Sequence, residues 1–330
     1  MAYPTYVLLF SIGKPRLGYY SAPFLTLTGL KSVLFGIGEI FSITCAMCWA
    51  IAVIMFKRIG DTMEASPLNL CKNALGLVFL IPTAMLIEGV ALPQLDWAQW
   101  GVLVVSGVLG IAIADTWFLK ALERVGAGRT AIIASLYSPF VVCLSFIYLG
   151  ERFIAAQWLG FVLVLSGILI AVYQKHYQDI SRKQLLTGCA FGAASIFLTA
   201  SSVVMMKPVL QQGSFLWLVS LRLLVGVITI LIFYGAQSEL KSNWKHIVSS
   251  AHNWRAIWVS SIFGTYLAMT FWLAGYKYTD ASISSVLNET SSIMIILLAW
   301  LVLKETLTLR KMIGVLMTFS GVALFVLVSD

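Results

Sequence analysis

Charged side chains are scarce in this sequence of 330 residues: Asp, Glu, Lys and Arg make up 11% and hydrophobic residues 60%. A soluble globular domain carries about 25% charged residues. The chain therefore lacks the polar surface that a water-soluble body needs, in agreement with its mean hydropathy of +0.92. This composition excludes an ordinary soluble domain and predicts an integral membrane protein.

Cysteine and histidine are also rare, which removes most metal and redox chemistry. The five cysteines lie within or beside apolar stretches, and the CxxC of Cys45 and Cys48 has no second CxxC and no nearby histidine. Buried cysteine usually behaves as a small hydrophobic residue. Because the three histidines show no ligand spacing, we expect neither a metal site nor a cofactor.

Long polar connections are missing as well. The longest link, 236–253, is too short to hold a folded domain, which excludes a membrane enzyme with a soluble catalytic lobe. Apolar stretches of about 20 residues span a bilayer core of about 30 Å, and within lipid such stretches must be helical to satisfy their backbone. Ten stretches qualify as spans: 35–56, 68–87, 97–119, 130–149, 155–173, 186–206, 215–234, 254–276, 283–303 and 312–328.

Residues 1–32 contain no unbroken apolar run long enough to span a membrane. Three prolines interrupt this segment, and Lys14 and Arg16 lie in its middle. Such a segment is too broken to span a membrane or to form the apolar region of a cleavable signal peptide. We expect an N-terminal tail, or an interfacial segment given its tyrosines and phenylalanines.

What the sequence does contain is a long duplication. Segment 127–172 aligns with 281–326 at a shift of 154 positions, which places Glu151 on Glu305. Each copy is an apolar span, a short loop with one glutamate, and a second apolar span that ends in Ser-Gly. Self-similarity at a fixed long period indicates two structurally equivalent units.

The duplication extends upstream and divides the chain into two halves of five spans each. At a shift of 150 positions, Phe41 falls on Phe191. Because five is an odd number, the second copy enters the membrane from the opposite side, as an inverted repeat. The sequence therefore predicts an all-α membrane protein of ten transmembrane helices, arranged as two inverted five-helix repeats, 33–174 and 184–329.

Short motifs recur in these spans. The first copy has Pro139, LGERF and SGILI, and the second repeats LKETL and SGVAL, with Ile293 in place of the proline. The run CAMCWAIAVIMFKR around Trp49 belongs to the same pattern, and Thr199 replaces the tryptophan in the second copy. Together these motifs resemble the EamA-like domain of the drug/metabolite transporter superfamily. The resemblance implies a ten-helix carrier in a bacterial inner (plasma) membrane, with a central cavity between the halves, that exports or exchanges small metabolites.

Orientation in the membrane stays open because two indications disagree. Most loop Lys and Arg residues gather on one side, which by the positive-inside rule favours both termini outside. The family resemblance implies that both termini lie inside. The net charge of +8 comes from these loops and forms no basic stripe, so we expect no nucleic acid partner.

Glu289 is the strongest candidate for a functional side chain, because charged groups at membrane depth are costly and usually functional. Ser285 lies on the same helical face, with further serines at helical spacing, and Asn288 is adjacent. We include all three in a site where Glu289 couples protons or meets a substrate charge. The alternatives are a buried glutamate paired with a cation, and serines that only let helices approach closely.

Three further charged residues lie within or near the spans. Arg222 is expected to clamp an anionic substrate, or to pair structurally with Glu289. Lys72 is expected to recognise the same charge, or to snorkel to the interface. Asp115, near the end of the third span, is expected either to serve transport or to face water at the cavity mouth or cap a loop.

Four aromatic residues could line the cavity: Trp49, Trp117, Tyr137 and Trp272. Trp49 is favoured because it lies well inside its span, and Tyr137 because it shares a helical stripe with Thr130, Ala134 and Ser138. The alternative for membrane tryptophan and tyrosine is an interfacial belt. Helix capping or a tight-loop pairing explains the repeated loop acids Glu151 and Glu305. The shared glycines are expected to be close-packing sites: Gly160, Gly167, Gly314 and Gly321.

These observations favour a secondary transporter that works by alternating access. The chain has no ATP-binding motif and no nucleophile–base or metal spacing within the spans, so it is not expected to be an enzyme. The alternatives are an antiporter of phosphorylated sugars or nucleotide sugars, and a non-transporting scaffold or lipid-handling subunit. The expected partners are a small-molecule substrate and the lipid bilayer, and a homodimer stays open.

Overall fold

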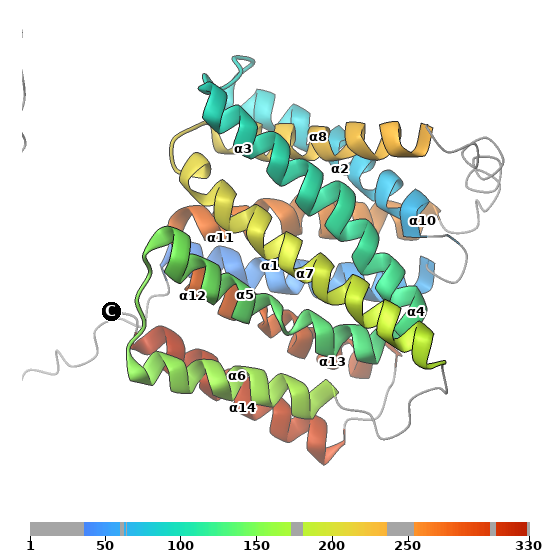
Figure 1. The fold of residues 1–330 in the computed structure, drawn as a ribbon, viewed down its shortest axis with the longest axis vertical. Helices are drawn as coiled ribbons and strands as arrows, with labels where there is room; N and C mark the ends of the chain where they lie inside the picture. Colours follow the sequence, from blue (N-terminus) through green and yellow to red (C-terminus); the bar gives the residue numbers. More distant parts are fainter. Residues whose placement is uncertain are drawn as a thin grey trace, which may run out of the picture. The chain divides into compact units, whose positions relative to one another are not determined.

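The computed structural model describes residues 36–59, 63, 65–172, 181–235, 254–303 and 308–328, and every secondary-structure element within these ranges is helical (Figure 1). The predicted tail, 1–32, and the loop residue Glu305 lie outside the described residues. The elements, with η for π-helical segments, are α1 (Ile37–Ile59), α2 (Ala65–Glu88), α3 (Trp97–Gly107), η1 (Val108–Ala114), α4 (Asp115–Ala134), α5 (Tyr137–Leu144), η2 (Ser145–Leu149), α6 (Ala155–Val172), α7 (Arg182–Leu210), α8 (Phe215–Gly235), α10 (Trp254–Ser260), η4 (Ser261–Ala268), α11 (Met269–Tyr278), α12 (Ala281–Asn288), α13 (Thr290–Leu303) and α14 (Leu309–Leu327).

Long apolar helices make this a multi-pass integral membrane protein. Seven helical segments in the described ranges are long and apolar enough to cross a bilayer, and Tyr137–Leu149 and Ala155–Ile170 are shorter apolar helices. Large apolar side chains face outward, among them Leu86 and Ile147, which are 86% and 70% exposed. Exposed leucine and isoleucine at this density suit a surface that contacts lipid.

One expected loop is helical. The sequence predicts that the third span ends at Leu119 and that the fourth begins at Thr130, whereas α4 continues from Asp115 to Ala134. The intervening residues include Lys120, Ala121 and Leu122, which favour helix, and they contain no proline. The stretch also carries charged residues and glycines, but these do not end the helix.

The fourth and ninth predicted spans, which are copies of one another in the duplication, are interrupted at equivalent positions. Regular helix is interrupted by a turn at Ser135 and Leu136, between α4 and α5, and at Glu289, between α12 and α13. Ser135 and Glu289 are 154 residues apart, which is the shift of the duplication. Pro139 in the first turn of α5 suits a helix start, but the second copy breaks without a proline, so sequence alone does not predict its break.

Helices α6 and α14 pack backbone to backbone through the shared glycines and lie side by side in Figure 1. A Cβ added at Gly160 would lie 2.8 Å from the Gly321 carbonyl oxygen, and one added at Gly167 would lie 2.7 Å from the Gly314 carbonyl oxygen. The predicted close-packing role of these glycines is confirmed. It joins the last helix of each half of the chain.

We expect Gly160→Ala to destabilise the protein by about 1–3 kcal/mol, because the new methyl group overpacks the α6–α14 contact. Gly101→Ala is the matched control, since Gly101 also lies within a helix and a Cβ added there would meet no atom within 4 Å. That control should be neutral or stabilise by about 0.5–1 kcal/mol. Thermal unfolding in detergent compares the two variants, and equal midpoints would refute close packing at Gly160.

Two carboxylates hold helix N-termini that lie far away in the sequence. Glu88 at the end of α2 accepts hydrogen bonds from the Leu216 and Trp217 amides of α8, at 3.0 and 3.1 Å. Glu151 accepts from the Ala281 and Ser282 amides of α12, at 2.8 and 3.1 Å. The capping prediction for Glu151 is therefore confirmed, but the capped helix belongs to the other half of the chain.

Candidate functional site

A line of side chains connects Arg222 on α8 with Glu289 between α12 and α13. The Arg222 Cζ atom lies 5.6 Å from the ring centroid of Trp272 on α11, and Trp272 Nε1 donates to the Tyr137 hydroxyl at 3.0 Å. Ser138, the next residue on α5, donates to Glu289. We call these five residues the polar line. Two of its contacts, from Trp272 to Tyr137 and from Ser138 to Glu289, join the two halves of the chain.

Glu289 is buried at the break between α12 and α13, with 6% of its surface exposed. Its Oε1 atom accepts from the Ser138 amide at 3.3 Å, and the Ser138 hydroxyl lies 3.0 Å from the same oxygen and 3.1 Å from the Ser285 carbonyl oxygen. Glu289 therefore points at a neighbouring helix and not at lipid. Its partners are neutral donors, so the alternative of a structural ion pair finds no support among the described contacts.

Ser285 and Asn288 lie beside Glu289 but make different contacts. The Ser285 hydroxyl donates to the Ser282 carbonyl at 2.8 Å within its own helix. Asn288 Nδ2 donates to the Ser284 carbonyl at 2.9 Å, while Asn288 Oδ1 is buried without a hydrogen-bond partner. Of the two, only Asn288 presents an uncommitted polar atom.

Arg222 is among the largest fully buried side chains, with 1% exposure. Its Nε donates to the Ser106 hydroxyl at 2.8 Å and its Nη2 to the Ser202 hydroxyl at 3.1 Å. The Nη1 atom is buried and has no partner. Arg222 does not pair with Glu289, because hydroxyl groups of α3 and α7 hold its guanidinium, so that expected alternative is wrong.

Lys72 and Asp115 form a second polar group, between α2 and the start of α4. Their Nζ and Oδ2 atoms are 2.7 Å apart, and the side chains are 7% and 29% exposed. Lys72 Nζ also donates to Asn73 Oδ1 at 3.3 Å. Because Lys72 is buried and bonded to an acid, the expectation that it snorkels to the interface is wrong, and Asp115 pairs with a cation instead of capping a loop.

The aromatic part of the site differs from the one expected. Tyr137 contacts both Trp272 and the Tyr276 hydroxyl, which is 2.6 Å from its own. Trp49 is half-buried and stacks edge-on against Phe56, with 6.0 Å between the ring centroids, in an apolar cluster. Trp272 was among the candidates but was not favoured, and Tyr276 carries no distinguishing signal in the sequence.

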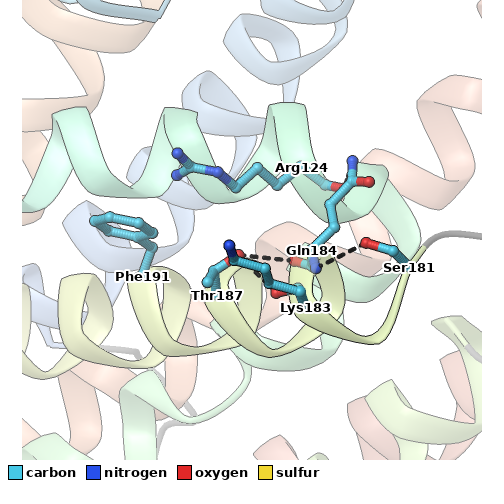
Figure 2. Close-up of a pocket in the computed structure, with 6 residues that line it drawn as sticks. All are labelled: Arg124, Ser181, Lys183, Gln184, Thr187 and Phe191. Carbon is cyan, nitrogen blue, oxygen red and sulfur yellow. Dashed lines mark hydrogen bonds between the residues drawn. The ribbon is translucent and has the colours of Figure 1, made fainter.

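A hollow of about 350 Å³ lies elsewhere, between the middle of α4 and the N-terminal part of α7. Figure 2 shows its lining: Arg124, Ser181, Lys183, Gln184, Thr187 and Phe191. None of the eight expected site residues lines this hollow. The expected central cavity between the halves therefore stays a prediction.

The chemistry available along the polar line is charge recognition and proton exchange. Glu289 offers a buried carboxylate, Arg222 a buried cation, and the aromatic residues between them offer ring faces and hydroxyl groups. Within the described ranges, no three His, Cys, Asp or Glu residues come together as they would around a metal ion.

Two stretches of the sequence match the model of one protein family, described as the EamA-like transporter family, over residues 36–173 and 186–327. The chain belongs to this family. The double match agrees with the resemblance to the drug/metabolite transporter superfamily, and the protein is accordingly a membrane transporter and not an enzyme.

Bacterial relatives support the same assignment. The chain is 26% identical over 268 residues to the uncharacterized transporter sll1164 of Synechocystis sp., covering 78% of this chain and 73% of that protein. It is 25% identical over 249 residues to protein PecM of Dickeya dadantii, covering 74% and 80%. A shorter match, 28% over 134 residues, covers 40% of this chain and 45% of the pseudopaline exporter CntI of Pseudomonas aeruginosa.

A solved crystal structure has the same fold. It superposes with a TM-score of 0.72 at 17% identity and covers 88% of this chain and 97% of its own. At that identity, the likeness concerns the arrangement of helices alone.

Proposed function

We propose that this transporter is a secondary active carrier that exports or exchanges a small metabolite by alternating access. In this proposal the chain spans a bacterial inner membrane ten times, as two inverted five-helix repeats, 33–174 and 184–329. The helix breaks at Ser135 and Glu289 support it, because equivalent repeats should break at equivalent positions. The double family match supports the same boundaries.

Substrate and coupling proton bind along the polar line in this proposal. The observation that carries it is buried Glu289 at a helix break, where its carboxylate accepts from Ser138 of the facing α5. An intramembrane carboxylate is functional by default. Glu289 also lies where its helix is locally irregular, because its amide is shared between the Ser285 and Val286 carbonyls. The polar line is complete within one chain, so the proposal does not require a homodimer.

Contacts at one end of the helical bundle supply the closed gate of the cycle. Lys207 at the end of α7 reaches Glu151 at 3.4 Å and the Thr279 carbonyl at 2.7 Å, while Glu151 caps α12. On the exposed surface, Gln99 Nε2 of α3 donates to Gln212 Oε1 at 2.7 Å. The contacts of Glu151 with Lys207 and α12, and of Gln99 with Gln212, join the two halves of the chain, and an opening at this end has to break them.

The experiment is transport by purified protein in liposomes, with a panel of metabolites and an imposed pH gradient. We expect at least one solute to move saturably and faster when the gradient favours exchange with protons. Protein-free liposomes are the control. A correctly folded protein that moves neither solutes nor protons would support the scaffold alternative and contradict the carrier.

A further inference from the structure

Arg222 is a buried cation that forms no ion pair with any residue in the described part of the chain. Its partners at Nε and Nη2 are the hydroxyl oxygens of Ser106 and Ser202, which carry no net charge. Two other acids form ion pairs with lysines and not with Arg222: Asp115 pairs with Lys72, and Glu151 pairs with Lys207. A guanidinium stays protonated even when buried, and an isolated buried charge is costly. The site is therefore incomplete without an anion.

The hydrogen bonds of the guanidinium show which of its nitrogens is left for that anion. Nη1 is buried with no hydrogen-bond partner, whereas Nη2 is closed in by π-helical η1. A Cβ added at Gly110 of η1 would lie 2.6 Å from Nη2, so backbone occupies that side of the guanidinium. The Trp272 ring lies against Cζ at 5.6 Å. Nη1 is thus the donor group of the guanidinium that is left for a ligand.

The number of positive charges available in the protein distinguishes a phosphate ester from a carboxylate as the bound anion. A phosphate ester carries close to two negative charges at neutral pH, and a clamp for it would combine Arg222 with Lys72. Lys72 is already neutralised by Asp115 at 2.7 Å. Asp115 is bonded to Lys72 and also attracts Arg222 electrostatically, so two cations share one carboxylate and one positive charge is left over. A single surplus charge with one free nitrogen suits a monoanion, and carboxylate is the common organic group with that charge.

We infer that the transported substrate carries a carboxylate, which pairs with Arg222 Nη1 beside the Trp272 ring. This inference rests on the proposed carrier function and narrows its substrate class. It argues against the phosphorylated-sugar and nucleotide-sugar alternatives, because those substrates need the second cation that Asp115 occupies.

The test measures thermal unfolding of the purified full-length protein against sodium acetate, benzoate, phosphate and sulfate at matched ionic strength. We expect acetate and benzoate to raise the unfolding midpoint saturably, with little effect from phosphate or sulfate. Benzoate is included because Trp272 offers a ring face.

Three variants locate the effect. Arg222→Gln should weaken benzoate binding about tenfold or more, as expected when a charged hydrogen bond is lost. Arg222→Lys keeps the charge and should retain part of the response, which separates lost binding from failed folding. Arg152→Gln makes the same change at an exposed arginine outside the polar line and should bind benzoate like the wild type.

Each outcome decides something. An equal response to phosphate, or an undiminished benzoate response in Arg222→Gln, overturns the carboxylate assignment. The absence of any thermal response in folded protein also overturns it. Transport restricted to neutral or cationic solutes overturns the carboxylate assignment as well, but it agrees with the proposed carrier function. Carboxylate binding at Arg222 without any transport would instead overturn the carrier function.

Discussion

Glu289→Gln should lower transport driven by a pH gradient about tenfold to hundredfold, which is the effect of losing an interaction of about 1.5–3 kcal/mol with a charged group. The glutamine Oε1 can still accept from the Ser138 amide and hydroxyl, which now bond to Glu289 at 3.3 and 3.0 Å. The fold should therefore persist while the ionisable group is lost. Initial rates in liposomes, with and without the gradient, measure the effect.

Glu39→Gln is the matched control for this variant. Glu39 lies near the start of α1 and accepts from the Thr279 hydroxyl at 2.9 Å, and a glutamine can also accept that bond. It removes one carboxylate outside the polar line and should leave gradient-driven transport within about twofold of wild type, as for a near-neutral surface change. Unchanged rate and unchanged pH dependence in Glu289→Gln would remove the coupling role.

Asp115→Asn should destabilise the protein by about 3 kcal/mol, because it leaves the buried Lys72 ammonium without its counter-ion. The reverse change, Lys72→Met, should cost less, about 1–2 kcal/mol, since Asp115 keeps 29% exposure and water solvates part of its charge. The pair is therefore expected to respond asymmetrically. Chemical denaturation in detergent measures both variants.

The double variant Lys72→Met with Asp115→Asn tests whether the two effects share one cause. Replacing both members of a buried ion pair is often close to neutral. The double variant should therefore be more stable than Asp115→Asn alone, with a coupling free energy of about 1–3 kcal/mol. Strictly additive losses would mean that the 2.7 Å contact does not carry the pairing.

The duplication in the sequence predicted two features of the helical packing. The duplication placed the shared glycines on one another, and α6 and α14 pack through these glycines. It also placed Ser135 on Glu289, where both helices break. Hydropathy could not predict the interruption at Glu289, because it arises from backbone hydrogen bonding. The Glu289 amide is shared between the Ser285 and Val286 carbonyls, both at 3.2 Å.

The predicted site residues had partners that sequence could not supply. The position of Glu289 and Arg222 within apolar spans predicted that they are functional. Their partners, Ser138 and Ser202, come from other helices of the bundle. Lys72 was grouped with Arg222 as a second substrate cation, and its pairing with Asp115 appears only when α2 and α4 are packed together. Contacts between separate helices decide which buried charges are free.

Water access beside Glu289 tests the alternating-access account most directly. Ser292, whose amide donates to the Glu289 carbonyl at 3.1 Å, is replaced by cysteine in a variant without the five native cysteines. A membrane-impermeant thiol reagent is then added from either side of the membrane, with Ala84→Cys, at a fully buried core position, as the unreactive control. The account predicts that Ser292→Cys is labelled from both sides. Protection from both sides in the folded protein, with labelling only after denaturation, would contradict it.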